Sequence, residues 1–175
     1  MVTGSRYRED FWMDDILVVG GAGYIGAHMV ALLHRKGLRV HTLDDLSAGF
    51  RESVKFGTFV LGDMGDVGLV RKLIETHAIS TIVHLAGSIS VSESIRDPAV
   101  YYLNNTAKTL SLAAVAAEAG VSRFIFSSTA AVYGNPIEIP LDERHPKHPV
   151  NPYGRSKWLV EQALPDFEAA YGMQY

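Results

Sequence analysis

A tyrosine and a lysine four residues apart are the first candidates for chemistry in this chain. Tyr153 and Lys157 follow Asn151 and Pro152, which suit the N-cap and the first position of a helix, so both side chains should lie on one helical face. A phenol can act as a base near neutral pH when nearby positive charges stabilise its ionised form. Lys157 and an oxidised nicotinamide would supply two such charges. Alone, such a pair is more often a surface accident, so the interpretation depends on two further motifs.

The first of these is a glycine-rich loop at residues 20–26. It follows a short apolar run, Ile16 to Val19, and opens a helical stretch, as a dinucleotide-binding loop requires. Gly20, Gly23 and Gly26 would allow a tight turn, close approach of a pyrophosphate and close packing of helix on strand. The free amides at the start of the helix would then face the phosphates.

An acidic pair follows at the end of the next predicted strand. Asp44 comes 18 residues after Gly26, the spacing expected for the carboxylate that binds the adenosine ribose hydroxyls. With Asp45 beside it, this carboxylate would repel the extra phosphate of NADP, so we expect NAD. A polar turn is the alternative for residues 44–47, and the nearby Arg51 keeps NADP open.

The second motif is a run of hydroxyls, Ser127, Ser128 and Thr129, at the end of a later predicted strand. Ligands collect at the carboxyl ends of parallel strands, and a hydroxyl there could bond the reacting oxygen and share the proton moved by Tyr153. Residues 84–87 also end a strand with small side chains, as a backbone passing close to a cofactor would. Asp63 could reach the adenine amino group or cap a turn. No serine-hydrolase elbow is present.

Composition narrows the class of protein. The 175 residues, 47% of them apolar, fit one globular domain, and the net charge of -3 without a basic block favours neither nucleic acid nor an anionic membrane as partner. The histidines show no metal-site spacing and cysteine is absent, so we expect no metal site and no disulfide. Without a signal-like or membrane-spanning apolar run, we expect a soluble, cytoplasmic protein.

Strand-like and helix-like segments alternate along the chain. We expect strands at residues 16–19, 39–43, 58–61, 81–85 and 123–126, and helices at residues 25–36, 67–76, 98–119 and 152–171. Residues 128–152 form a long irregular stretch and are therefore expected to be functional. This order predicts a Rossmann-like, doubly wound parallel sheet in a three-layer α/β/α domain spanning residues 14–175. Residues 1–13 read as a tail, and Met13, directly before the first strand, is a hypothetical natural start.

At these motifs the chain resembles the extended short-chain dehydrogenase/reductase family, the NAD-dependent epimerases and dehydratases. The likeness covers residues 16–175 and is carried by residues 20–26, 43–47, 84–87, 101–105, 126–134 and 151–157. It is nearest to the members that interconvert UDP-glucose and UDP-galactose by oxidation and reduction at C4 of the sugar, through a transient 4-keto intermediate. Dehydratases of the family carry an acidic residue just after the hydroxyl. Ala130 and Ala131 stand there in this chain, which favours epimerisation.

The resemblance implies a role for each motif. Tyr153 would be the base, Lys157 would hold the nicotinamide ribose, and Thr129 would occupy the hydroxyl position. The expected substrate contacts are Ser128, Thr129 and Tyr153. The expected cofactor contacts, from motifs and resemblance together, are Gly20, Gly23, Tyr24, Ile25, Gly26, Asp44, Asp45, Leu46, Ser47, Asp63, Met64, Leu85, Ala86, Gly87, Asn104, Ser127, Tyr153 and Lys157.

The resemblance also implies two features of the whole molecule. The helices around residues 99–119 and 152–171 correspond to those that pair subunits in the family, so a homodimer is expected. Family members continue well beyond Tyr175 with a C-terminal substrate domain that is absent here, and Ile89 stands where the nearest members can place a lysine. Three hypotheses therefore stay open: a C4 epimerase, a non-catalytic NAD-binding remnant, and one half of a split enzyme.

Overall fold

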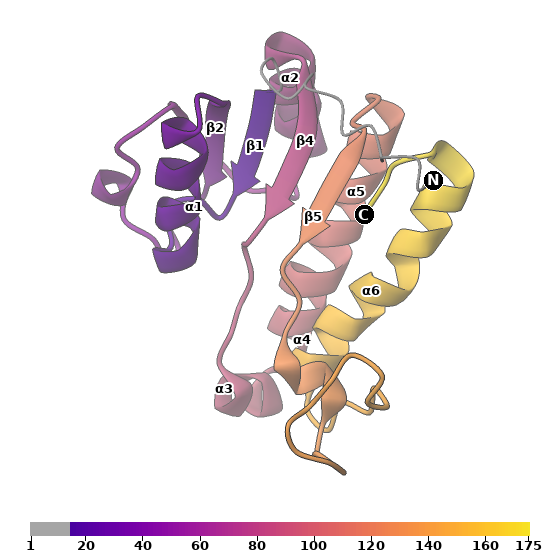
Figure 1. Cartoon of the computed structure of the whole chain (residues 1–175). Helices are drawn as coiled ribbons and strands as arrows, with labels where there is room; N and C mark the ends of the chain where they lie inside the picture. Colours follow the sequence, from indigo (N-terminus) through magenta and orange to yellow (C-terminus); the bar gives the residue numbers. More distant parts are fainter. Residues whose placement is uncertain (1–14) are drawn as a thin grey trace, which may run out of the picture.

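A parallel five-stranded sheet with helices on both faces forms the molecule (Figure 1). The structure is a computed structural model that describes residues 15–175, so the predicted tail and the hypothetical start at Met13 lie outside the described residues. In chain order the elements are β1 (Asp15–Val19), α1 (Tyr24–Arg35), β2 (Arg39–Asp44), η2 (Arg51–Ser53), β3 (Thr58–Leu61), α2 (Val67–His77), β4 (Ile79–His84), α3 (Val91–Arg96), α4 (Pro98–Tyr101), η3 (Tyr102–Ala107), α5 (Lys108–Glu118), β5 (Arg123–Phe126), η4 (Ala130–Tyr133) and α6 (Pro152–Tyr171).

The strand order is β3-β2-β1-β4-β5, with every pair parallel. The chain moves outward in one direction from β1 to β3 and in the other from β4 to β5. The order therefore reverses between β1 and β4, and a crevice outside the carboxyl ends of these two strands is the expected ligand site. The predicted doubly wound sheet is confirmed.

Alternate residues of β1 divide between two cores. Leu17 and Val19 point to the face covered by α2, α5 and α6, and they belong to the larger apolar cluster. Ile16 and Val18 point to the face covered by α1, where Val30 of that helix packs against them. Since side chains of a strand alternate between faces, burial on both sides explains why this strand is a continuous apolar run.

The long predicted helix at residues 98–119 is interrupted. Tyr102–Ala107 adopts a π-helical turn between α4 and α5, and the short helix α3 precedes α4 without having been predicted. A π turn adds one residue to the helical repeat, and such turns occur most often at functional sites. Its polar residues bond to neighbouring segments, as described below, which the apolar period of the sequence does not reveal.

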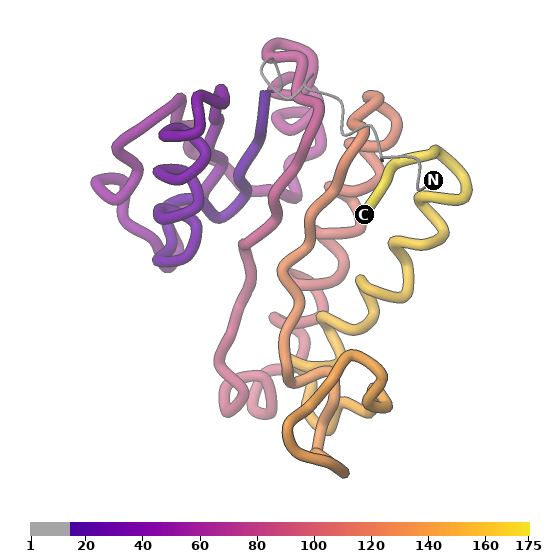
Figure 2. The backbone as a smooth tube through the Cα atoms, viewed as in Figure 1, coloured from indigo at the N-terminus to yellow at the C-terminus, as the bar shows by residue number. Residues whose placement is uncertain are grey.

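The polar connections gather at one end of the sheet. Figure 2 follows the backbone past the carboxyl ends of β4 and β5, where α3, the long connection after β5 and the start of α6 all lie. Asn151 caps α6 by accepting a hydrogen bond from the Gly154 amide, 2.8 Å away, so the predicted helix start is confirmed. This places Tyr153 at the same end of the sheet as the glycine loop.

Candidate active site

The glycine loop is shaped by two contacts that leave no room for a side chain. Gly20 has φ +84°, and a Cβ there would lie 2.5 Å from the Ala86 amide nitrogen. A Cβ on Gly26 would lie 2.1 Å from the Gly20 carbonyl oxygen, because α1 packs directly on the loop. These are the tight turn and the close helix packing predicted from the sequence.

Gly23 is different, because the protein itself does not require a glycine there. A Cβ at Gly23 would meet only the Gly20 carbonyl oxygen, at an ordinary contact distance of 3.5 Å. Gly23 is also the N-cap of α1 and has no side chain to satisfy the first amides of the helix. Exposed amides beside an empty Cβ position fit a phosphate group that approaches the backbone closely.

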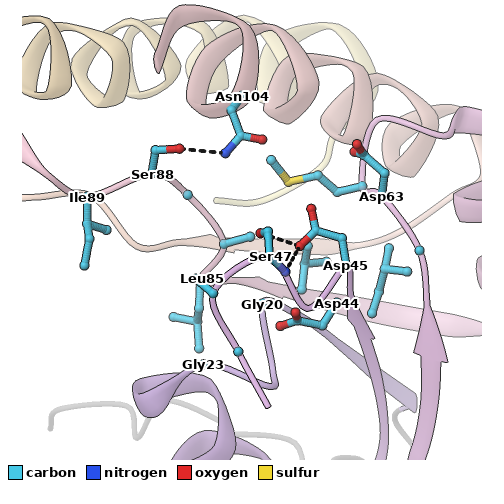
Figure 3. Close-up of a pocket in the computed structure, with 18 of the residues that line it drawn as sticks. Gly20, Gly23, Asp44, Asp45, Ser47, Asp63, Leu85, Ser88, Ile89 and Asn104 are labelled. Atoms are coloured by element: carbon cyan, nitrogen blue, oxygen red, sulfur yellow. Dashed lines mark hydrogen bonds between the residues drawn. The ribbon is translucent and has the colours of Figure 1, made fainter. Parts of the chain in front are cut away.

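A cavity of about 390 Å³ opens beside this loop, outside the carboxyl ends of β1 to β4 (Figure 3). Most of the predicted cofactor residues line it: Gly20, Gly23, Asp44, Asp45, Ser47, Asp63, Met64, Leu85, Ala86, Gly87 and Asn104. The other predicted cofactor residues do not line it: Tyr24, Ile25, Gly26, Leu46, Ser127, Tyr153 and Lys157. The cavity is also lined by residues that were not among the predicted cofactor contacts: Val19, Leu43, Ala48, Gly49, Gly62, Ser88, Ile89, Ser90 and Glu93.

Asp44 organises the acidic end of the cavity. One carboxylate oxygen accepts a hydrogen bond from the Ala22 amide (2.9 Å) and the other from the Leu46 amide (2.8 Å). Asp44 therefore ties the glycine loop to the turn after β2. Each carboxylate oxygen still has a lone pair for a ligand hydroxyl. The neighbouring Asp45 accepts from both the amide and the hydroxyl of Ser47 and adds a second negative charge (Figure 3).

Asp63 is held by two partners. Its carboxylate accepts a hydrogen bond from the Gly65 amide at 2.7 Å and pairs with Lys108 of α5 at 2.5 Å. Burial acts to raise the pKa of this carboxyl, but the bonds from Lys108 and Gly65 outweigh it, and the pKa is lowered. Of the two sequence expectations, the structure shows the turn cap. A reach toward adenine stays a prediction.

Lys157 joins the cavity to the strand that carries the hydroxyls. Its ammonium Nζ donates to the Ser127 carbonyl (3.2 Å) and to the Ala86 carbonyl (3.4 Å), and it lies 4.8 Å from the centre of the Phe126 ring. A Cβ on Gly87, where φ is +153°, would lie 3.1 Å from this nitrogen. The side chain is buried, and burial lowers its pKa to about 8. A positive charge is thus held at the edge of the cavity, one helical turn after Tyr153.

The three predicted hydroxyls have different surroundings. Thr129 caps η4, where its Oγ1 accepts a hydrogen bond from the Ala131 amide (3.1 Å), so its own proton stays available to donate. Ser128 donates to the Glu161 carboxylate of α6. Ser127 contributes its carbonyl oxygen to Lys157. Of the two predicted substrate hydroxyls on this strand exit, Thr129 is thus the freer donor.

Asn105 is a buried site residue that the sequence reasoning did not assign. Its Oδ1 accepts from the Ser88 amide (2.8 Å), and its Nδ2 donates to the Ser88 carbonyl (2.9 Å) and to Ser156 Oγ (3.2 Å). It therefore locks the π turn to the cavity wall and to the residue before Lys157. A polar residue within the apolar pattern of residues 100–117 was the available signal.

His84, at the end of β4, is fully buried and uncharged. Its Nε2 hydrogen-bonds the Thr109 hydroxyl at 2.7 Å, and burial together with the Lys157 charge lowers its pKa to about 3. Because the His84 imidazole is neutral, it adds no positive charge to that of the Lys157 ammonium. Within residues 15–175 no group of three or more His, Asp or Glu side chains could hold a metal ion, and no helix in that range is long and apolar enough to cross a membrane.

Comparison with known proteins identifies the family. Residues 16–175 match the NAD dependent epimerase/dehydratase family, and the chain belongs to it. Among its relatives, the UDP-glucose 4-epimerase of Rhizobium meliloti (strain 1021) is 45% identical over 161 residues, which are 92% of this chain and 49% of the relative. The UDP-glucose 4-epimerase of Azospirillum brasilense is 46% identical over 160 residues, 91% of this chain and 46% of the relative.

Solved structures agree with this assignment. The UDP-glucose 4-epimerase of Brucella ovis in complex with NAD superimposes with a TM-score of 0.91 at 41% identity, over 93% of this chain and 50% of that one. The enzyme of Thermotoga maritima with UDP-glucose gives a TM-score of 0.86 at 35% identity, over 91% of this chain and 52% of that one. The chain therefore spans about half the length of the relatives that it matches.

Proposed function

We propose that this chain binds NAD in the cavity and carries the catalytic groups of a UDP-glucose 4-epimerase. The observation that carries the proposal is the position of Lys157, whose Nζ reaches both the cavity wall at Ala86 and the strand exit at Ser127. The relatives support it, because the Brucella ovis and Thermotoga maritima structures are UDP-glucose 4-epimerases that contain NAD and UDP-glucose respectively.

The cavity fits the parts of NAD. The amides at the start of α1 and the open space at Gly23 suit the pyrophosphate, and Asp44 suits the adenosine ribose. The paired charges of Asp44 and Asp45 oppose a ribose phosphate, so NAD is proposed over NADP. Lys157 would hold the nicotinamide ribose, with Ser127 and the small residues 85–87 beside it.

In the proposed mechanism Tyr153 moves the proton. Its phenolate takes the proton from the sugar's 4-hydroxyl and returns it in the second half of the reaction. NAD supplies the redox chemistry, since it accepts the hydride from C4 and returns it to the other face of the 4-ketosugar. The Lys157 ammonium stabilises the phenolate electrostatically, and Thr129 donates a hydrogen bond to the reacting oxygen. Ala130 and Ala131 place no acid there to expel water.

The test is the interconversion of UDP-glucose and UDP-galactose by the 175-residue chain, with Tyr153→Phe as the matched variant. Because the variant lacks only the proton-transferring oxygen, we expect turnover to fall at least about 100-fold. The variant should still bind NAD, since the contacts proposed for the cofactor at Gly23, Asp44 and Lys157 remain. Unchanged turnover in Tyr153→Phe would refute the mechanism.

Two alternatives give other outcomes of the same assay. A non-catalytic remnant binds NAD and shows no turnover under any condition. One half of a split enzyme also binds NAD but turns over only after a second polypeptide supplies the substrate-binding portion. Both alternatives follow from the coverage, because the chain matches only about half of each relative. In the relatives, binding energy from the unmatched half would help orient the reacting sugar.

We also propose that the chain forms a homodimer through the layer that contains α5 and α6. These helices pack against each other and against the π turn, and several apolar side chains of the layer face outward: Val100, Leu103 and Leu159. Exposed apolar side chains gathered on adjacent helices are typical of a subunit interface.

A further inference from the structure

Glu161 continues the row of functional residues along α6. Tyr153, Lys157 and Glu161 are each four residues apart, so they follow one another along the same helical face. The Glu161 side chain is only 21% exposed. The proposed mechanism gives Glu161 no role, yet it lies one helical turn after Lys157, whose ammonium is proposed to stabilise the Tyr153 phenolate.

The two carboxylate oxygens of Glu161 bind two different segments. Oε1 accepts the hydrogen bond from Ser128 Oγ, at the exit of β5, and Oε2 accepts one from Lys147 Nζ at 2.6 Å, in the long connection before α6. An ionised carboxylate only accepts hydrogen bonds, so the Ser128 proton is committed to Glu161. Charge-assisted bonds of this kind are roughly twice as strong as neutral ones.

The hydrogen bond from Ser128 to Glu161 matters because Ser128 lies between two residues of the proposed site. Ser127, one residue earlier, is held by Lys157, and Thr129, one residue later, carries the hydroxyl proposed to meet the substrate. Two successive residues of the strand exit are thus tied to two successive turns of α6. This double attachment sets how far Thr129 lies from Tyr153 on the same helix.

We propose that Glu161 is a positioning residue that acts through Ser128 to hold Thr129 in register with Tyr153. Lys147 supports it by occupying the second oxygen, which leaves Oε1 directed at Ser128. The inference rests on the proposed function, because it assigns the Thr129 hydroxyl to the reacting oxygen. An exposed ion pair alone contributes little to stability, so a Glu161 that only paired with Lys147 would be nearly dispensable.

The first measurement needs no turnover. Amide NMR of the labelled 175-residue chain would compare Glu161→Leu, Ser128→Ala and the control Glu168→Leu, which places the same substitution at an exposed position of α6. We expect the first two variants to shift the amide signals of residues 128–131 and to raise the exchange rate of the Ala131 amide at least about tenfold. Glu168→Leu should leave these signals in place.

The second measurement is kinetic. Misplacing a reacting group by about 1 Å costs up to about 100-fold in rate, so kcat of Glu161→Leu should fall by about 10- to 100-fold. KM for UDP-glucose and the NAD dissociation constant should stay within about twofold. Because both variants break one connection, the Ser128→Ala effect should not add to that of Glu161→Leu.

The outcomes separate this inference from the proposed function. If the unsubstituted chain does not turn over, its epimerase activity is refuted, while the amide signals still decide the positioning role. Unchanged signals at residues 128–131 in Glu161→Leu would overturn the role, as would a loss of kcat equalled by a loss of NAD affinity. If Glu161→Leu does not fold, the exchange rate of the Ala131 amide in Ser128→Ala carries the same test, and an unchanged rate there would overturn the role.

Discussion

The ammonium group of Lys157 is buried, and removing a charge from water costs free energy. Lys157 has two carbonyl oxygens and an aromatic face around its nitrogen, and no carboxylate within residues 15–175 pairs with it. Its charge is therefore stabilised by dipoles, which compensate only part of the lost hydration. That leaves the positive charge free to act on a phenolate or a ligand.

The cost of this charge should be visible as a pH dependence of stability. Burial lowers the pKa of Lys157 from 10.5 to about 8, so between these values the unfolded chain holds a proton that the folded chain has lost. Stability relative to Lys157→Met should thus rise with pH from about 8 to 10.5, by up to about 3 kcal/mol. Urea unfolding of both proteins across this range measures the difference.

The control for this experiment is Lys72→Met, which changes an exposed lysine of α2 in the same way. Its unfolding free energy should follow that of the unsubstituted chain at every pH. If the Lys157→Met curve also runs parallel to the unsubstituted one, the ammonium is not desolvated as the structure indicates.

Sequence reasoning selects residues whose type and spacing suit the proposed chemistry, but not the residues that hold them in place. Tyr153 and Lys157 could be predicted because helical spacing alone brings them together. Asn105 and Glu161 could not, because their partners, Ser88, Ser156 and Ser128, are brought to them only by the folded chain. A polar residue in a helix has many possible partners, and one sequence does not choose between them.

At the scale of elements, backbone packing is the main reason that the glycine loop has its shape. Strands β3 and β5 begin and end where the sequence predicts, and α1 begins one residue earlier. The π turn was missed because it depends on bonds from Asn105 and Thr106 to other segments, not on the local apolar period. Regular elements follow local pattern, whereas departures from regularity follow tertiary contacts.

The packing of α1 on the loop gives a prediction for Gly26→Ala. In a helix this change ordinarily stabilises by up to about 1 kcal/mol, because alanine has the higher helix propensity. Here the new methyl would meet the Gly20 carbonyl oxygen at 2.1 Å and Gly21 Cα at 2.7 Å, both backbone atoms. We expect a destabilisation of more than about 2 kcal/mol, measured by urea unfolding, together with a loss of NAD binding.

Gly68→Ala is the matched control, because Gly68 lies in α2 and its Cβ would meet only Asp66 Oδ1, at 3.5 Å. This variant should be as stable as the unsubstituted chain or more so. Equal responses of the two glycines would show that helix propensity, and not contact with the loop, decides the effect at Gly26.

The whole molecule has two unequal sides. On one side of the sheet α1 lies over β1 and β2, and Ile125 of β5 is 54% exposed. On the other side α2, α5 and α6 form a continuous layer over a single large core. The doubly wound parallel sheet, covered by helices on both faces, could be predicted from the alternation of strands and helices. Which outer surface meets another molecule could not, because partners leave no period in the sequence.

The substitution Leu103→Glu tests the proposed dimer. Leu103 lies in the π turn and is 63% exposed, so a charge there should not disturb the fold but would be desolvated in an interface formed by this layer. We expect the unsubstituted chain to sediment as a dimer and Leu103→Glu to raise the dissociation constant at least about tenfold, as a buried unpaired charge would. Leu32→Glu is the control, since Leu32 is 44% exposed on α1 across the sheet and should leave the dimer intact. The proposal is wrong if the unsubstituted chain is strictly monomeric. It is also wrong if Leu32→Glu weakens the dimer and Leu103→Glu does not.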